Sequence, residues 1–328
     1  MKSLHDCAAE ARRPRRAFNE YFLPRMWTAG FVLLLFLSGA CDKKRQQEVV
    51  VYTSQDREYA EPIFQEFTRR SGIKVRALYD SETAKTVGLA NRLLAEKSHP
   101  QCDVFWNNEE LRTWQLAAKG VLETNWASVG YRSRRVVLNT NWHAPGGTTF
   151  STGIFTQTWS AGRVAVAYPL FGTTATHFLA LRQYWGAEKW ENWCRALRVN
   201  KALLVDGNSA VVRLVGRGEA WFGLTDSDDV AAGKREGLPV DGLQLADVPE
   251  LLIANTVAFV LHRPHPLEAQ RLCDFLGLPE VAERLVEANA LQSADPAERV
   301  QDRLQVNYPE LLRDLEAATK KMEEIFLK

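Results

Sequence analysis

Three carboxylates lie within four residues of one predicted loop, Thr225-Asp226-Ser227-Asp228-Asp229. Carboxylates this close repel one another unless a cation, a helix N-terminus or water offsets their charge. The loop is therefore a candidate for binding an ammonium group, or a metal that bridges a ligand. Its structural alternative is an ordinary helix cap with solvated acids. The loop lacks the glycine and the distant glutamate of an EF-hand, so we predict no calcium site.

Two other loops have the composition of an anion site. Gly172, Thr173 and Thr174 place a glycine and hydroxyl groups at the expected start of a helix. Helix N-termini offer free N–H groups and partial positive charge, which favour phosphate, phosphonate or carboxylate. The segment 81–86 repeats this pattern and adds a lysine, with Thr83, Lys85 and Thr86 as its candidate ligands. Simple N-capping is the alternative for each loop.

Catalysis needs a further arrangement that the sequence does not supply. His177 together with the three carboxylates has the donors to hold a divalent metal for phosphate-ester hydrolysis. The chain has no His-x-x-x-His pair, no nucleophile elbow and no phosphate loop ending in Gly-Lys-Ser or Gly-Lys-Thr. We therefore expect a binding protein, with neither an enzymatic activity nor a resident cofactor.

Strands alternate with helices along most of the chain, which predicts doubly wound α/β lobes. The expected strands cover residues 48–52, 73–79, 103–106, 134–140, 164–168, 203–205, 221–224 and 253–261. In such sheets ligands lie beyond the carboxyl ends of the strands, at the helix N-termini. The residues that we expect to contact the ligand are Ser54, Gln55, Asp56, Thr83, Lys85, Thr86, Asn108, Glu109, Gly172, Thr173, Thr174, Asn208, Asp226, Asp228 and Asp229.

The N-terminus has the layout of a secretory signal. A basic segment precedes an apolar run from Trp27 to Leu37, and small residues then lead to Cys41. The run is shorter than the roughly 20 residues of a membrane-spanning helix. We expect residues 1–40 to be a signal peptide of the lipoprotein type, with translation starting at Met1 or Met26. Cys41 is then the lipidation site, and residues 41–47 form a polar tether.

About 290 residues follow the signal, more than one hydrophobic core usually supports. We expect two lobes, residues 48–133 plus 252–328 and residues 134–251, with the chain crossing between them twice. The formal charge of +1 indicates no nucleic-acid partner. Cys102, Cys194 and Cys273 form neither a metal-ligand spacing nor a disulfide framework, and we interpret them as buried apolar residues.

Several short segments, in a characteristic order, resemble bacterial solute-binding proteins for ferric iron, polyamines, thiamine and organophosphonates. They are Val51-Tyr-Thr-Ser, the run from Phe64 to Val75, Asp103-Val-Phe-Trp, Gly207-Asn-Ser-Ala, Gly218-Glu219, Asn255-Thr-Val-Ala, and the region from His265-Pro266 to Val281. The resemblance implies a type 2 periplasmic binding fold with two hinge crossovers. It also implies a periplasmic monomer that serves the permease and ATPase of an ABC importer.

The ligand positions depart from the ferric-binding members of this family. Those members use a histidine, a glutamate and a tyrosine pair, and the matching positions here are Asp56, Asn108 beside Glu109, and Asp228-Asp229. Without the tyrosine pair, ferric binding needs phenolates from elsewhere, and Tyr131 and Tyr168 are the candidates.

An anion site facing an acidic loop favours a small phosphorylated or zwitterionic ligand. We therefore expect an organophosphonate or a similar compound, held in a cleft between the lobes. Ferric iron or an iron complex is the first alternative. A lipid carrier, or a sensor-linked binding protein without an importer, is the second.

Overall fold

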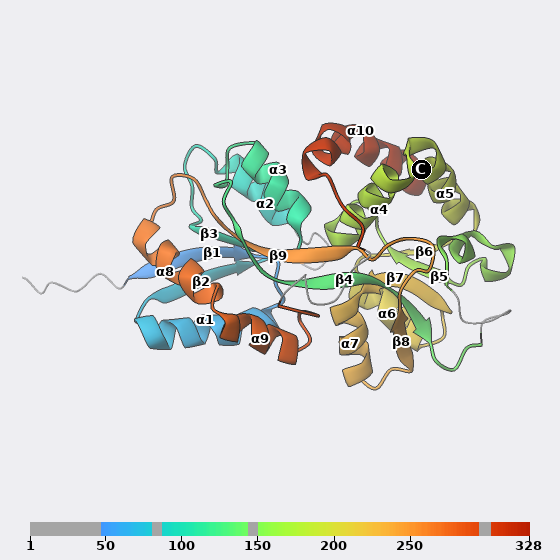
Figure 1. The fold of residues 1–328 in the computed structure, drawn as a ribbon, viewed down its shortest axis with the longest axis horizontal. Helices are drawn as coiled ribbons and strands as arrows, with labels where there is room; N and C mark the ends of the chain where they lie inside the picture. Colours follow the sequence, from blue (N-terminus) through green and yellow to red (C-terminus); the bar gives the residue numbers. More distant parts are fainter. Residues whose placement is uncertain (1–46, 81–86, 144–149, 295–302) are drawn as a thin grey trace, which may run out of the picture. The chain divides into compact units, whose positions relative to one another are not determined.

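The computed structural model describes residues 47–80, 87–143, 150–294 and 303–328. A nine-stranded sheet runs through this part of the chain in the order β2-β1-β3-β9-β4-β7-β5-β6, with β8 beside β4 (Figure 1). The strands are β1 (Glu48–Thr53), β2 (Lys74–Tyr79), β3 (Val104–Asn107), β4 (Ala127–Asn139), β5 (Val164–Ala167), β6 (Leu203–Val205), β7 (Phe222–Asp226), β8 (Val240–Leu243) and β9 (Leu252–Phe259).

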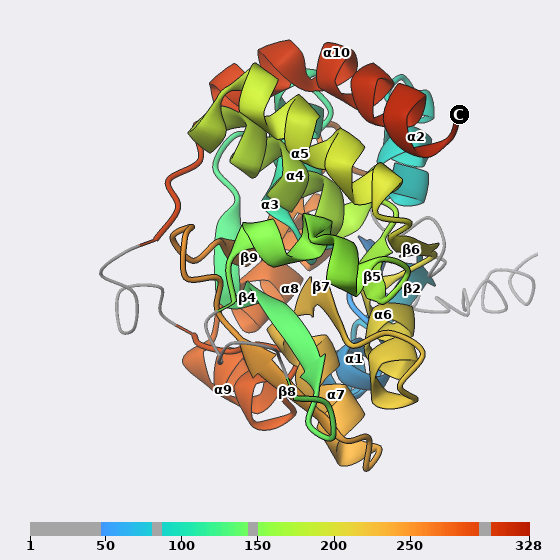
Figure 2. The same cartoon turned by 90° about the vertical axis from the view of Figure 1, so that its right-hand side faces the viewer.

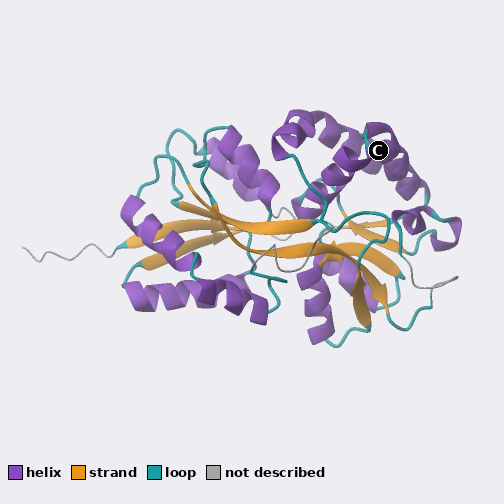
Figure 3. Cartoon of the chain, viewed as in Figure 1, coloured by secondary structure: helices purple, strands orange, loops and turns teal. Residues whose placement is uncertain are grey.

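Helices cover both faces of this sheet, as the side view of the strands in Figure 3 shows. They are α1 (Arg57–Ser71), α2 (Val87–Ala95), α3 (Glu110–Ala118), α4 (Gly172–Trp185), α5 (Ala187–Val199), α6 (Asn208–Gly216), α7 (Ser227–Arg235), α8 (Pro266–Leu276), α9 (Pro279–Glu287) and α10 (Tyr308–Phe326), with short 3-10 turns η2 (Thr152–Thr156) and η3 (Thr158–Ser160). Among the described helices, none is long and apolar enough to cross a membrane.

Two long strands join the halves of the sheet. The first part of β4 pairs antiparallel with β9, and its last part pairs with β7 and β8. Strand β1 runs parallel to β2 and β3, and β5 runs parallel to β6 and β7. We call β1–β3 with α1–α3, α8 and α9 the first lobe, and β5–β8 with α4–α7 the second. The predicted fold class, two α/β lobes joined by two crossover strands, is confirmed.

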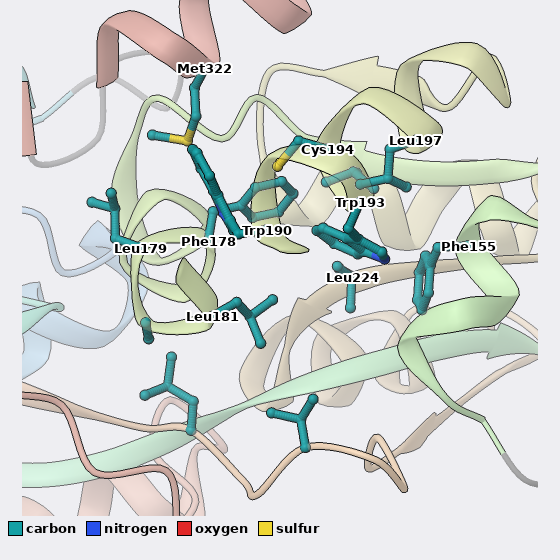
Figure 4. Packing of buried hydrophobic residues seen from close by; sticks show 14 of the residues in the cluster. Phe155, Phe178, Leu179, Leu181, Trp190, Trp193, Cys194, Leu197, Leu224 and Met322 are labelled. Carbon is teal, nitrogen blue, oxygen red and sulfur yellow. The ribbon is translucent and has the colours of Figure 1, made fainter. Parts of the chain in front are cut away.

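Four hydrophobic clusters fill the layers between helices and sheet. In the first lobe, α1, α8 and α9 pack on one face and α2 and α3 on the other. In the second lobe, α6 and α7 cover one face, and α4 and α5 cover the other. Figure 4 shows this last cluster, where Phe178, Trp190, Trp193 and Cys194 meet Met322 of α10. Cys102 and Cys194 are buried, whereas Cys273 is half-buried.

Helix α10 packs on both lobes. It contacts α3 of the first lobe and α4 and α5 of the second, and Figure 2 shows it running beside α5. Its buried residues include Leu315, Met322 and Phe326, which belong to the same cluster as α4 and α5. The sequence predicts residues 252–328 in the first lobe, and these lobe boundaries stay a prediction. In the structure, α10 of this segment packs against helices of both lobes.

Strand β4 starts at Ala127, seven residues before the strand that the sequence predicts at 134–140. The extra residues include Ser128 and Gly130, which are poor strand formers, so pairing with β9 decides their conformation. The pairing shifts register between Ser128 and Tyr131, and Gly130 has a φ of 116°. A Cβ on Gly130 would lie 2.9 Å from the carbonyl oxygen of Ser293, which only glycine avoids.

Strand β7 carries Asp226 toward the polar loops, and its close packing is testable at Gly223. A Cβ at this position would overlap the carbonyl oxygen of Ala165 and Cγ1 of Val211. We expect Gly223→Ala to lower the free energy of unfolding by about 1–3 kcal/mol, measured by urea denaturation. The matched control is Gly153→Ala, whose added Cβ meets only Ser151 Oγ at 3.5 Å. Equal stability of the two variants would contradict the packing described for β7.

Candidate ligand-binding site

A small cavity lies where the carboxyl ends of strands and the N-termini of helices from both lobes meet. Its volume is about 60 Å³. Most of its lining is polar, and both lobes contribute to it. The lining residues are Asp56, Asn108, Arg132, Ala167, Tyr168, Phe171, Gly172, Thr173, Thr174, Asp206, Gly207, Asn208, Ser209, Asp226, Asp228 and Asp229.

The N-termini of α4 and α6 form one wall of this cavity. Helix α4 follows Phe171 and helix α6 follows Gly207, and neither of these flanking residues caps its helix with a side chain. Gly172 has a φ of 54°, a left-handed conformation that glycine adopts without strain. The first turns of α4 and α6 therefore lie at the cavity wall, in the arrangement that helix N-termini offer to anions.

Behind this wall, a buried ion pair between Arg134 and Asp226 contacts the N-termini of three helices. Arg134 Nη1 donates to Asp226 Oδ1 at 2.6 Å. The other carboxylate oxygen of Asp226 accepts from Thr173 of α4 at 2.6 Å and from Asn208 of α6 at 2.9 Å. Asp226 itself is the residue that precedes α7. The relative positions of α4, α6 and α7 are thus set by one carboxylate and its guanidinium partner.

The charges in this network shift the pKa values of its members. Burial alone raises the pKa of Asp226, but the guanidinium groups of Arg134 and Arg132 outweigh burial and hold that pKa below its ordinary value. His177 accepts a long hydrogen bond from Arg134 Nε at 3.4 Å. Burial, and then the charge of Arg134, lower the pKa of His177 to about 3. His177 is therefore a neutral structural acceptor.

A second arginine connects the two lobes. Arg132 Nη1 donates to Asp228 Oδ2 at 2.6 Å, and its Nη2 donates to the backbone oxygen of Asn108 at 2.9 Å. Asp228 lies in the first turn of α7, whereas Asn108 follows β3. Burial raises the pKa of Asp228, and the neighbouring Asp226 adds to this, against the opposing effect of Arg132. Arg132 therefore both lines the cavity and holds its two sides together.

Two further hydrogen bonds cross between the lobes outside the cavity lining. Glu109 caps α3 by accepting from the backbone N–H groups of Leu111 and Arg112, and it also accepts from Thr176 of α4 at 3.1 Å. Arg235 of α7 donates to Tyr59 of α1 at 2.7 Å. In this conformation the lobes are in direct contact around the cavity.

The structure brings together most of the residues that the sequence predicts as ligand contacts. The predicted residues that line the cavity are Asp56, Asn108, Gly172, Thr173, Thr174, Asn208, Asp226, Asp228 and Asp229. Their role in binding stays a prediction. Thr83, Lys85 and Thr86 lie outside the described residues, as does Cys41.

Three predicted contacts have other positions. Glu109 is the α3 cap described above. Ser54 is buried and donates to Asn107 Oδ1 at 2.8 Å, and Gln55 accepts from Asn255 at 2.9 Å. Neither Ser54 nor Gln55 lines the cavity, because hydrogen bonds turn both side chains toward neighbouring strands and loops. Of the two candidate tyrosines, Tyr168 lines the cavity and Tyr131 does not.

Sequence reasoning missed the two arginines. Arg132 and Arg134 are two residues apart on a strand, so their side chains point to the same face of the sheet. Two arginines with this spacing, in a sequence that also has an acidic loop, were the signal from which the ion pairs could have been predicted. From the sequence, a cation, a helix N-terminus or water is expected to offset the charges of that loop. In the structure, Arg134 and Arg132 already offset the charges of Asp226 and Asp228, with ion-pair distances of 2.6 Å each.

A family model for bacterial extracellular solute-binding proteins matches residues 49–288. The chain belongs to this family. As a solute-binding protein it works outside the cytoplasm with an ABC importer and is not an enzyme, which confirms the expected class. Among curated proteins the sequence has no significant match.

Solved structures of other periplasmic binding proteins share the fold of this solute-binding protein. Iron-bound HitA from Pseudomonas aeruginosa is 19% identical with a TM-score of 0.74, covering 85% of this chain and 99% of its own. The ferric binding protein from Campylobacter jejuni is 15% identical, with a TM-score of 0.75 and coverages of 85% and 99%. AfuA from Actinobacillus pleuropneumoniae, with fructose-6-phosphate bound, is 16% identical, with a TM-score of 0.73 and coverages of 85% and 98%.

The neutral state of His177 predicts a specific loss of stability in acid. Below pH 6.5 an unfolded histidine takes up a proton that the folded protein, with a pKa near 3 at His177, does not bind. Stability due to this residue therefore falls as the pH drops from 6.5 toward 3. Between pH 7 and pH 5, we expect the free energy of unfolding of the wild type to fall by about 2 kcal/mol more than that of His177→Asn.

Urea denaturation at the two pH values measures this difference. The exposed His99, replaced in the same way, is the control and is expected to keep the wild-type pH dependence. The assignment would be wrong if His177→Asn and the wild type lost stability in parallel.

Proposed function

We propose that this solute-binding protein captures a small organic phosphonate or phosphate between its lobes. The observation that carries the proposal is the meeting of two helix N-termini, those of α4 and α6, at one cavity wall, where the flanking residues Phe171 and Gly207 supply no side-chain cap. Thr173 and Thr174 lie at the same wall, and Arg134 donates to the hydroxyl of Thr173 at 3.2 Å from behind it. The N–H groups at two helix N-termini and the neighbouring hydroxyls together favour a phosphoryl or phosphonyl group.

The size and polarity of the cavity support a small polar guest. The cavity has a volume of about 60 Å³ and a mostly polar lining. A lipid carrier needs a long apolar cavity, whereas the lining here is dominated by aspartates, threonines, asparagines and an arginine. This lining argues against the lipid-carrier alternative.

Ferric iron is the second candidate. HitA and the Campylobacter protein are iron-binding structures with this fold, and ligand oxygens of Asp226, Asp228 and Asp229 lie within 4.8 Å of one another. However, Asp226 and Asp228 are each paired with an arginine at 2.6 Å. Guanidinium groups this close repel a metal cation, and they compete for the same carboxylate oxygens. We therefore favour the phosphorus ligand.

Isothermal titration of the purified mature protein separates these candidates. We expect 2-aminoethylphosphonate or inorganic phosphate to bind with measurable heat, and ferric citrate to give neither heat nor a visible charge-transfer band. Thr174→Val removes a hydroxyl at the cavity wall and is expected to weaken binding about 5- to 10-fold, the effect of one hydrogen bond.

Thr156→Val is the matched control, because Thr156 bonds within the short turn η2 at 3.0 Å, away from the cavity. Absence of heat with both phosphorus compounds, together with a coloured ferric complex, would replace this proposal with the iron alternative.

We further propose that the mature protein is a monomer held at a membrane by lipid on Cys41, with residues 1–40 removed. The small residues before this cysteine and the polar segment after it support processing at that site. Cys41→Ser is expected to shift the protein from the membrane fraction to the soluble periplasmic fraction, as judged by immunoblotting. Cys7→Ser, which changes a cysteine inside the signal, is the control and should leave the protein at the membrane. An unchanged distribution of Cys41→Ser would exclude lipid anchoring at this residue.

A further inference from the structure

Two buried polar atoms at the cavity lack a hydrogen-bond partner among the described residues. They are Nε of Arg132, a donor, and Oδ1 of Asp228, an acceptor. Both side chains line the cavity, and the two residues are only 5% and 8% exposed. Burying an unpaired donor or acceptor is costly, so such atoms at a binding site indicate where a ligand group completes the hydrogen bonding.

The two atoms belong to a single ion pair. Arg132 Nη1 and Asp228 Oδ2 are 2.6 Å apart, which leaves Nε on one partner and Oδ1 on the other. Arg132 Nε lies 3.9 Å from Asp226 Oδ2, too far for a hydrogen bond. A ligand group that meets both unpaired atoms must accept one hydrogen bond and donate another.

The chemistry of candidate groups narrows the choice to a hydroxyl. An ammonium group only donates, so it leaves Arg132 Nε unpaired and adds a third cation beside two arginines. A phosphonate dianion only accepts, so it leaves Asp228 Oδ1 unpaired and faces carboxylates. A hydroxyl both donates and accepts, and it is neutral.

The local charge agrees with a neutral group. Arg132, Arg134, Asp226 and Asp228 carry two positive and two negative charges, linked by ion pairs of 2.6 Å. These four charges therefore cancel one another, whereas the wall at α4 and α6 offers the N–H groups of two helix N-termini. The two ends of one ligand then meet two chemically different surfaces.

We infer that the ligand is a hydroxylated organic phosphonate or phosphate, whose hydroxyl bonds to Arg132 and Asp228 while its phosphorus group lies at α4 and α6. This inference rests on the proposed function and specifies the substrate class of the same site. It also replaces the ammonium group that the acidic loop suggests in the sequence.

Three compounds that differ at one position test the inference on the wild-type mature protein. They are ethylphosphonate, 2-hydroxyethylphosphonate and 2-aminoethylphosphonate, compared by isothermal titration at constant pH and salt. We expect the hydroxyl compound to bind roughly 10- to 100-fold more tightly than the ethyl compound, the effect of hydrogen bonds to charged groups. We expect the amino compound to bind no better than the ethyl compound.

The outcomes distinguish this inference from the function on which it rests. Binding of all three compounds with equal affinity, or tightest binding of the amino compound, would overturn the hydroxyl assignment and leave the phosphonate site in place. If neither these three compounds nor inorganic phosphate bound, the proposed function itself would be overturned.

Arg132→Lys then tests the position of the hydroxyl. Lysine keeps the positive charge beside Asp228 but has no Nε–H donor in the place of the guanidinium. We expect the preference for the hydroxyl compound over the ethyl compound to fall below 3-fold. Arg135→Lys is the control on the same strand, because Arg135 pairs with Glu250 at 2.7 Å and does not line this cavity. A full hydroxyl preference in Arg132→Lys would contradict the assigned contact.

Discussion

The buried ion pair between Arg134 and Asp226 is the interaction on which the site depends. Arg134 lies on β4 opposite Asp226, which is the last residue of β7 and directly precedes α7. Thr173 and Asn208 donate to the same carboxylate, so three helices share one electrostatic anchor. Breaking one partner of a buried pair costs about 3–5 kcal/mol, because an unpaired charge is left in a medium that solvates it poorly. The cavity wall keeps its geometry only while this pair is intact.

This anchor also changes what the acidic loop can bind. Carboxylates that already face guanidinium groups attract a cation less strongly than free carboxylates do. The similar structures have the same fold, yet one is bound to iron and another to fructose-6-phosphate, at identities of 19% and 16%. Ligand choice within this fold therefore depends on a few side chains at the cavity and not on the arrangement of helices and strands. Under the proposed function, the arginines on β4 are the side chains that reduce the attraction of the acidic loop for a cation.

The sequence predicted the fold class and most of the cavity lining, because both follow from local patterns. Alternating strands and helices place polar loops at one edge of each lobe, and Thr173, Asn208 and Asp228 lie in the first turns of the helices that follow such loops. Arg132 and Arg134 could not be predicted in the same way, since an arginine inside a strand is read as solvated until its partner is known. That partner is nearly a hundred residues away in the sequence, in hydrogen bonds that span 92 and 96 positions. Glu109 shows a second limit of local patterns, because its side chain caps α3 and does not line the cavity, while its role in binding stays a prediction.

A crystal structure of the mature protein, grown with an organic phosphonate and ferric citrate both present, shows which of the two ligands the cavity selects. We expect tetrahedral phosphorus density against the N-termini of α4 and α6, with Arg134 still bonded to Asp226 and no anomalous signal at the iron edge. An iron ion coordinated by Asp226, Asp228 and Asp229, with the guanidinium groups displaced from these carboxylates, would contradict it.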